Sequence, residues 1–166
     1  MAKVEIINVE YIRSPYEDLV ESICSKWDMV RYKWNGRTRK GTDCLHFAAS
    51  VMDELYGTEH SKDLASLPPD AFVHNKDGVA RAVRHLMSTY DVERVETIEA
   101  GDLVISGSHG NPVPAHLMVA SLPSYLWEAT FPHVRRIGYG IFSSEQIVAI
   151  YRARDKSKWN RAPQSS

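Results

Sequence analysis

The sequence has little of what several protein classes require. Its 166 residues include only two cysteines, Cys24 and Cys44, too few for a disulfide framework or a four-cysteine zinc site. No apolar run approaches the roughly 20 residues that span a bilayer, and residues 1–5 lack the basic and apolar segments of a signal peptide. The formal net charge of −1 gives no overall field for binding nucleic acid. We therefore expect a protein made in the cytoplasm, with no nucleic-acid and no membrane partner.

The composition is that of one ordinary globular domain. With 43% hydrophobic and 25% charged residues, the chain can bury a core without help from metals or disulfides. We expect a single domain over residues 1–155 and a polar C-terminal tail over residues 156–166, loose at its end.

Two helices are predicted in the first part of the chain. The first opens at Ser14-Pro15-Tyr16-Glu17, where Ser14 can act as N-cap and Glu17 can complete a capping box. After a short extended piece, residues 30–36, the second helix runs from Cys44 to Tyr56, because its apolar residues have helical spacing. Thr42 or Asp43 is its expected N-cap, and Gly57 is expected to end it.

A long connection and a third helix follow. Residues 59–75 have little periodicity and are expected to form a surface connection. Asn75 can cap the third helix, whose buried stripe is formed by Val79, Val83, Leu86, Met87 and Tyr90.

The second half of the chain changes to the alternating pattern of β-strands. Five strands are predicted, at Asp102–Ser106, His116–Leu122, Tyr125–Phe131, Val134–Ile141 and Ile147–Arg154. Pro123-Ser124 is typical of a hairpin turn, and residues 107–114 of a wider loop. Helices followed by consecutive antiparallel strands indicate an α+β protein.

Cys44 lies where a helix begins, directly after the turn-forming sequence Gly41-Thr42-Asp43. Unpaired backbone N–H groups and the helix dipole favour an anion at this end, and the thiolate is the reactive form of cysteine. By position alone a free cysteine is more often a small buried hydrophobe, which is the role expected of Cys24 in the middle of the first helix. Cys44 is therefore the candidate nucleophile.

Several segments, in order, resemble the NlpC-type cell-wall peptidases. The nucleophile segment is represented by Tyr32-Lys33-Trp34-Asn35-Gly36, by Gly41-Thr42-Asp43-Cys44 and by the helix end Leu55-Tyr56-Gly57. The later strands are represented by Gly101-Asp102-Leu103-Val104, Ala115-His116-Leu117-Met118-Val119, Leu126-Trp127-Glu128-Ala129 and Val134-Arg135-Arg136. Within the family, the chain is most similar to the short single-domain form encoded among phage tail genes.

The resemblance implies a papain-like fold, with N-terminal helices packed on an antiparallel sheet of about five strands. It also implies hydrolysis of peptide bonds in peptidoglycan stems without a cofactor, by a protein incorporated in a phage tail and in contact with other tail-tip proteins. Tyr32 would help to orient or polarise the substrate, and Asp43 would face a substrate amine. Where the family usually has serine and then glycine after its cysteine, this chain has Leu45 and His46, and their bulk is expected to narrow the cleft.

A nucleophilic thiol needs an imidazole to accept its proton and return one to the leaving amine. His46 is a poor candidate, because two residues along a helix its side chain points about 200° away from Cys44. His116 opens an apolar strand, from which a polar side chain can reach a cleft, and the resemblance also selects it as the base.

A third polar group usually orients the base. Glu128 is the candidate, in the strand after that of His116, at a place where the family often has histidine. The alternative for Glu128 is a solvated strand residue, and His133 is then the reserve candidate.

The sequence thus predicts a cysteine hydrolase of the NlpC type. Two alternatives stay open: an inactive tail-tip structural subunit of the same fold, and a thiol acyltransferase or amidase acting on a non-peptide substrate. A metal hydrolase is disfavoured, because no His-Glu-x-x-His pattern occurs.

Overall fold

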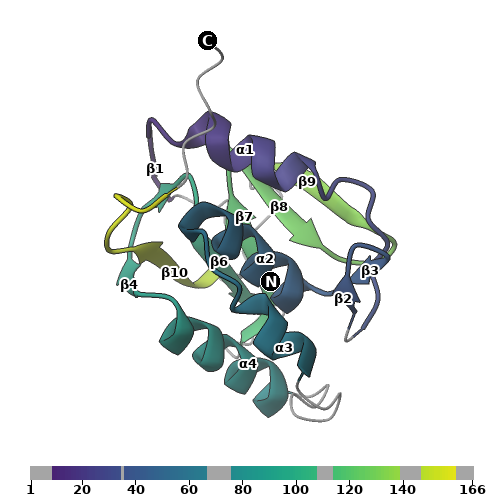
Figure 1. Cartoon of the computed structure of the whole chain (residues 1–166). Helices are drawn as coiled ribbons and strands as arrows, with labels where there is room; N and C mark the ends of the chain where they lie inside the picture. Colours follow the sequence, from purple (N-terminus) through teal and green to yellow (C-terminus); the bar gives the residue numbers. More distant parts are fainter. Residues whose placement is uncertain (1–8, 35, 67–75, 108–113, 139–146, 160–166) are drawn as a thin grey trace, which may run out of the picture.

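The computed structural model describes residues 9–34, 36–66, 76–107, 114–138 and 147–159 (Figure 1). Its helices are α1 (Glu17–Ser25), α2 (Cys44–Tyr56), α3 (Ser61–Ser66) and α4 (Lys76–Thr89). Its longer strands are β4 (Val92–Val95), β6 (Leu103–Gly107), β7 (Pro114–Ala120), β8 (Tyr125–Ala129), β9 (Val134–Gly138) and β10 (Ile147–Ala153). The two-residue strands β1 (Tyr11–Ile12) and β5 (Ile98–Glu99) pair in parallel, and β2 (Arg37–Thr38) pairs with β3 (Gly41–Thr42) in antiparallel orientation.

The longer strands form one antiparallel sheet in the order β4-β10-β6-β7-β8-β9. All five predicted strands are therefore confirmed, although residues 139–141 of the fourth lie outside the described residues. Ser124, with a φ of 69°, lies in the predicted hairpin turn between β7 and β8. The sheet has a sixth strand that the sequence did not predict. This strand, β4, pairs with β10 and carries exposed Glu93 and Arg94 at its centre, so its pattern resembles a polar loop.

The helices pack on the sheet through one hydrophobic core. Side chains from α1, α2 and α4, including Val20, Phe47 and Leu86, share this core with Leu117 and Val119 of β7. Figure 1 shows α2 between α1 and α4 in front of the sheet. None of the described helices is long and apolar enough to cross a membrane. Helix α2 packs against strands β7 and β8 of the sheet, and Cys44 is its first residue.

Helix α2 has the predicted bounds. Asp43 is its N-cap and accepts a hydrogen bond of 2.8 Å from the backbone N–H of His46. Gly57 ends the helix with a φ of 69°, a left-handed conformation that glycine adopts without a Cβ penalty. Of the two proposed caps, Asp43 rather than Thr42 therefore fixes the start of the helix next to Cys44.

Helix α1 begins at Glu17, slightly later than the predicted opening at Ser14. The expected local hydrogen bonds are present in part: the backbone N–H of Ser14 donates to Glu17 Oε2 over 2.9 Å, and Ser14 Oγ accepts from the N–H of Tyr16 over 3.1 Å. Because Ser14 Oγ binds two residues ahead rather than three, it forms a turn before the helix.

The prediction of an irregular connection over residues 59–75 was wrong for α3. This helix starts at Ser61, whose backbone N–H donates to the buried carboxylate of Asp53 over 2.7 Å. Its start is thus fixed by a residue of α2, which local periodicity does not reveal. Residues 67–75, with the proposed cap Asn75, lie outside the described residues.

The described part of the predicted C-terminal tail packs on the domain. Trp159 is only 4% exposed and makes edge contacts with the rings of Tyr16 and Tyr56, at centroid distances of 5.0 and 6.1 Å. Residues 156–159 therefore contribute an aromatic anchor, and residues 160–166 lie outside the described part of the chain.

Candidate active site

The thiol of Cys44 is partly exposed at the first residue of α2. The preceding residues are held by β-type hydrogen bonds: β3 pairs with β2, and Thr42 also bridges to Tyr32. The side chain of Asp43 is 4% exposed and caps the helix. The chain therefore reaches Cys44 through a fixed turn, and the positive end of the helix dipole lies at this residue.

His116 and Glu128 lie on the same face of the sheet. In the register of β7 and β8, Met118 pairs with Glu128, and His116 is two residues from Met118, so all three side chains have the same orientation. His116 Nε2 lies 2.9 Å from Glu128 Oε1. Cys44 lies close enough to the imidazole of His116 to raise the pKa of His116. Because Nε2 faces Glu128, the nitrogen that serves the thiol is Nδ1.

The surroundings of His116 favour its protonated form. Burial by itself would lower the pKa of His116, but the hydrogen bonds and charges of Cys44 and Glu128 outweigh it and raise this pKa to about 10. The imidazolium of His116 is therefore favoured at neutral pH. In general, a positive charge beside a cysteine favours the reactive thiolate form.

Glu128 is buried, with 5% of its surface exposed, and is held from two sides. Its Oε1 faces His116, and its Oε2 accepts a hydrogen bond of 2.9 Å from Nε of Arg135 on β9. Burial raises the pKa of Glu128, but the hydrogen bonds and positive charges of His116 and Arg135 outweigh it, and the pKa is lowered. The carboxylate is therefore ionised and fixed in direction.

Arg135 belongs to one of the segments that resemble the NlpC-type family, but the sequence assigned it no role. Glu128 and Arg135 are direct cross-strand partners in the register of β8 and β9. Opposite charges at paired positions attract, so an antiparallel pairing of these two predicted strands would have been the signal for Arg135.

Tyr32 lies next to Cys44 and Asp43. Burial raises the pKa of the Tyr32 hydroxyl, and the negative charges of Cys44 and Asp43 raise it further. The backbone N–H of Tyr32 donates to the carbonyl of Pro132 over 3.0 Å, which ties this segment to the chain just before β9. The five predicted site residues are thus brought together from α2, β7, β8 and the segments before α2.

The two residues after Cys44 point into the protein. Leu45 belongs to the hydrophobic core, and His46 is 6% exposed. His46 Nδ1 lies 2.9 Å from Thr42 Oγ1, and its ring packs edge-on against Trp27. The bulk of both side chains is therefore accommodated in the interior.

His133, the reserve candidate, has a different partner. Its Nδ1 lies 2.8 Å from the carbonyl oxygen of Val134, whereas the hydrogen bond to His116 comes from Glu128. The described residues contain no group of three or more histidine, cysteine or acidic side chains arranged to hold a metal ion. The geometry supports thiol chemistry assisted by an imidazole and a carboxylate.

Comparison with known proteins supports the fold. No family model matches the chain, and no curated protein matches its sequence. Among solved structures, the NlpC/p60 domain of the peptidoglycan hydrolase SagA matches with a TM-score of 0.52 and 18% identity, over 81% of this chain and 96% of that domain. An NlpC/p60 family protein from Bacillus cereus ATCC 10987 matches with a TM-score of 0.53 and 15% identity, over 84% of this chain but only 40% of that protein. The predicted papain-like, NlpC-type α+β fold is confirmed.

Proposed function

We propose that the protein is a cysteine peptidase that hydrolyses peptide bonds in the stems of bacterial peptidoglycan. The observation that carries the proposal is the contiguous set Cys44, His116 and Glu128 in a fold of the NlpC/p60 type. One structural neighbour with this fold is a domain of a peptidoglycan hydrolase. The likeness to this domain supports the substrate class, and the three side chains support the reaction.

In the proposed mechanism, the thiolate of Cys44 attacks the carbonyl carbon of the scissile amide. The protonated Nδ1 of His116 then donates its proton to the leaving amine, which releases the amine and leaves a thioester on Cys44. A water molecule gives its proton to His116 and attacks the thioester, so that the carboxylic acid product leaves and the thiolate is regenerated. Glu128 accepts the Nε2–H of His116 throughout, which fixes the ring and stabilises its positive charge.

Two further residues are proposed to contact the substrate. Tyr32 is close enough to Cys44 and Asp43 for their charges to affect its hydroxyl, and we assign it to orienting or polarising the substrate. Asp43 is assigned to a substrate amine, in addition to its capping role. We also propose a place in a phage tail tip with other tail proteins as partners, which rests on the sequence resemblance to the single-domain form encoded among phage tail genes.

The test is digestion of purified peptidoglycan, with new amines measured chemically and the released muropeptides identified by mass spectrometry. We expect the wild type to release amines and Cys44→Ala to be slower by at least about 10³-fold. Cys24→Ala is the matched control: Cys24 is fully buried in the core, so this variant should retain activity. A thiol reagent should inactivate the wild type through the partly exposed Cys44.

The other outcomes identify the alternatives. If the wild type and Cys44→Ala both release nothing, the proposal is wrong and an inactive structural subunit of this fold is favoured. Turnover of a non-peptide ester or amide, with peptidoglycan left intact, would instead indicate an acyltransferase or amidase. Activity that Cys44→Ala retains in full would exclude the thiol mechanism.

A further inference from the structure

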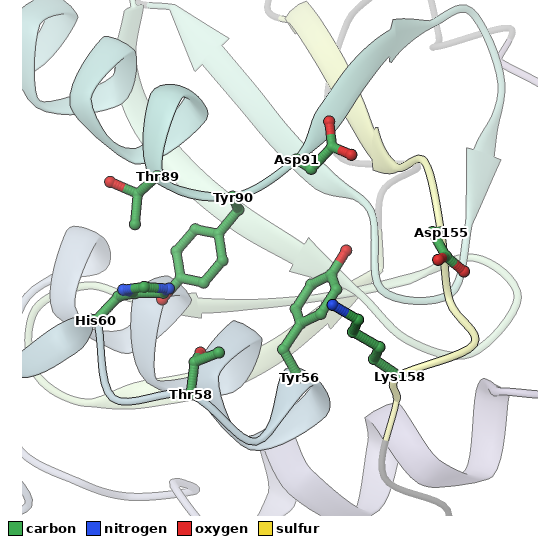
Figure 2. Close-up of a pocket in the computed structure, with 8 residues that line it drawn as sticks. All are labelled: Tyr56, Thr58, His60, Thr89, Tyr90, Asp91, Asp155 and Lys158. Atoms are coloured by element: carbon green, nitrogen blue, oxygen red, sulfur yellow. The ribbon is translucent and has the colours of Figure 1, made fainter.

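A pocket of about 220 Å³ lies at the C-terminal end of α2, where Tyr56 is the last helical residue. Cys44 is the first residue of the same helix, so the two ends are about 18 Å apart at 1.5 Å per residue. The pocket walls come from the end of α2 with the loop after it, from the junction of α4 and β4, and from the segment after β10 (Figure 2). This pocket is therefore separate from the proposed active site.

A buried carboxylate with no part in the proposed reaction holds two of these walls together. Asp53 of α2 accepts hydrogen bonds from Thr58 Oγ1, the N–H of His60 and the hydroxyl of Tyr90 on Oδ1, over 2.7, 3.0 and 2.7 Å. On Oδ2 it accepts the N–H of Ser61 over 2.7 Å. A buried carboxylate is unfavourable unless it is fully bonded, and here its bonds fix the loop after α2 against the end of α4. The pocket is thus pre-formed.

Aromatic rings supply the apolar part of the pocket. The rings of Tyr56 and Tyr90 are nearly parallel, at 27°, with centroids 6.2 Å apart, and His60 packs edge-on against Tyr90. Tyr56 is partly exposed. Figure 2 shows these three rings arranged around the pocket. A ligand with a flat apolar face has a surface to pack on here.

The charged groups of the pocket balance each other. Asp91 and Asp155 lie on the side of the Tyr56 hydroxyl, and Lys158 also lines the pocket (Figure 2). Arg154 adds a second positive charge, 3.5 Å from Asp91. Two carboxylates and one ammonium line the pocket, and Arg154, outside the lining, pairs with Asp91. Asp155 and Lys158 then balance each other, so the rim has hydrogen-bond acceptors and donors but little net charge. This balance disfavours a strongly cationic or anionic ligand and favours a neutral polar one.

We propose that this pocket binds one neutral sugar ring. A pyranose presents a C–H face that packs on an aromatic ring, and hydroxyl groups that both donate to carboxylates and accept from an ammonium group. The volume is smaller than the roughly 300–1,000 Å³ of drug-sized sites, which suits a single ring rather than several. The site does not depend on the chemistry of Cys44, so it stands or falls separately from the proposed peptidase activity.

The test is an NMR titration of the full chain with the tetramer of N-acetylglucosamine, and with tetraglycine as a neutral peptide of another class. We expect the sugar to shift the backbone amide signals of Thr58, His60 and Asp91, and to leave the signal of Cys44 in place. Cys44→Ala should bind the sugar equally well. Tetraglycine should cause no shift at the pocket.

Exposed positions of the rim allow variants that leave the fold intact. Asp155→Asn and Lys158→Met should each weaken sugar binding about tenfold, because each removes a charge-assisted hydrogen bond. Asp28→Asn, at another exposed aspartate, is the matched control and should bind normally. The proposal is overturned if the sugar does not bind, if its signals map to Cys44 and His116, or if the rim variants bind as the wild type does. Shifts at the pocket with tetraglycine alone would replace the sugar site by a peptide site.

Discussion

Glu128 is a single buried residue whose hydrogen bonds link three strands of the sheet at the proposed active site. It lies on β8 and is bonded on one side to His116 of β7 and on the other to Arg135 of β9. An isolated buried glutamate would tend to take up a proton, and a neutral carboxyl would stabilise the imidazolium poorly. Arg135 therefore contributes by keeping Glu128 ionised and correctly directed, without contacting the thiol pair in the proposed mechanism.

This role predicts a specific effect of Arg135→Met on the pH dependence of kcat/KM. Because Arg135 helps to lower the pKa of Glu128, the variant should raise that pKa. We expect the acidic limb of kcat/KM to move to higher pH, and kcat to fall about tenfold at neutral pH with little change in KM. Arg135→Lys should restore part of the activity, because it retains the charge but not the planar guanidinium.

The neighbouring arginine gives a matched control. Arg136 points away from Glu128, donates to Glu21 over 2.8 Å and lies over the ring of Tyr125. Arg136→Met should leave the acidic limb where it is. If the acidic limb of kcat/KM moved equally in the two variants, its position would depend on the overall charge of β9 and not on the contact with Glu128.

Among the secondary-structure elements, β10 is joined to the turn before β6 by a buried ion pair. Arg152 donates to both oxygens of Asp102, over 3.0 and 2.8 Å, and Asp102 is fully buried. Burial outweighs the effect of Arg152 and raises the pKa of Asp102 from 3.8 to about 6. The folded state thus binds a proton more tightly than the unfolded chain, so its stability falls as pH rises from about 4 to about 6.

Asp102→Asn should change stability in two ways. The decline in stability between pH 4 and 6 should disappear, because the variant lacks the carboxyl group of Asp102 that titrates in this range. At pH 7 the variant should be at least as stable as the wild type, because the neutral amide avoids the burial cost that raises the pKa of Asp102, and Arg152 keeps its ion pair with Glu99. Urea unfolding at several pH values measures both, and Asp91→Asn, in an exposed pair with Arg154, should change little. A decline that persists in Asp102→Asn would assign it to another group.

The elements that the sequence predicted are those whose pattern is local. Helix α2 was correct at both ends because its cap, its apolar spacing and Gly57 all lie within the segment. The starts of β4 and α3 depend on distant partners: β4 is an edge strand next to β10, and α3 begins on the carboxylate of Asp53. Arg135 was missed as a partner of Glu128 for the same reason, because only the register of β8 and β9 brings the two together.

For the molecule as a whole, the C-terminal segment contributes to stability although its composition is polar. Trp159 fills a space between Tyr16, Tyr56 and the turn at Gly101, where a Cβ on residue 101 would lie only 2.2 Å from its ring. Gly101 also has a φ of +89°, which disfavours any other residue. The last described residues thus close the core over α1 and α2.

Trp159→Ala should therefore destabilise the protein by about 3 kcal/mol, within the usual cost of removing a buried tryptophan. Trp34→Ala is the control, because Trp34 is 38% exposed. Thermal or urea unfolding of both variants measures the difference. Equal stabilities would mean that residues 156–159 form a dispensable tail after all.

Helix α2 has a consequence for how a polymer would be cut. Cys44, the proposed nucleophile, and the proposed sugar pocket lie at opposite ends of one helix of 13 residues, which is buried along most of its length. Because the length of a helix is fixed, α2 would set a distance of about 18 Å between a bound sugar and the sulfur of Cys44. Peptidoglycan whose scissile bond lies at that span from a sugar ring would be cut preferentially, and shorter fragments would lose the benefit of the second contact.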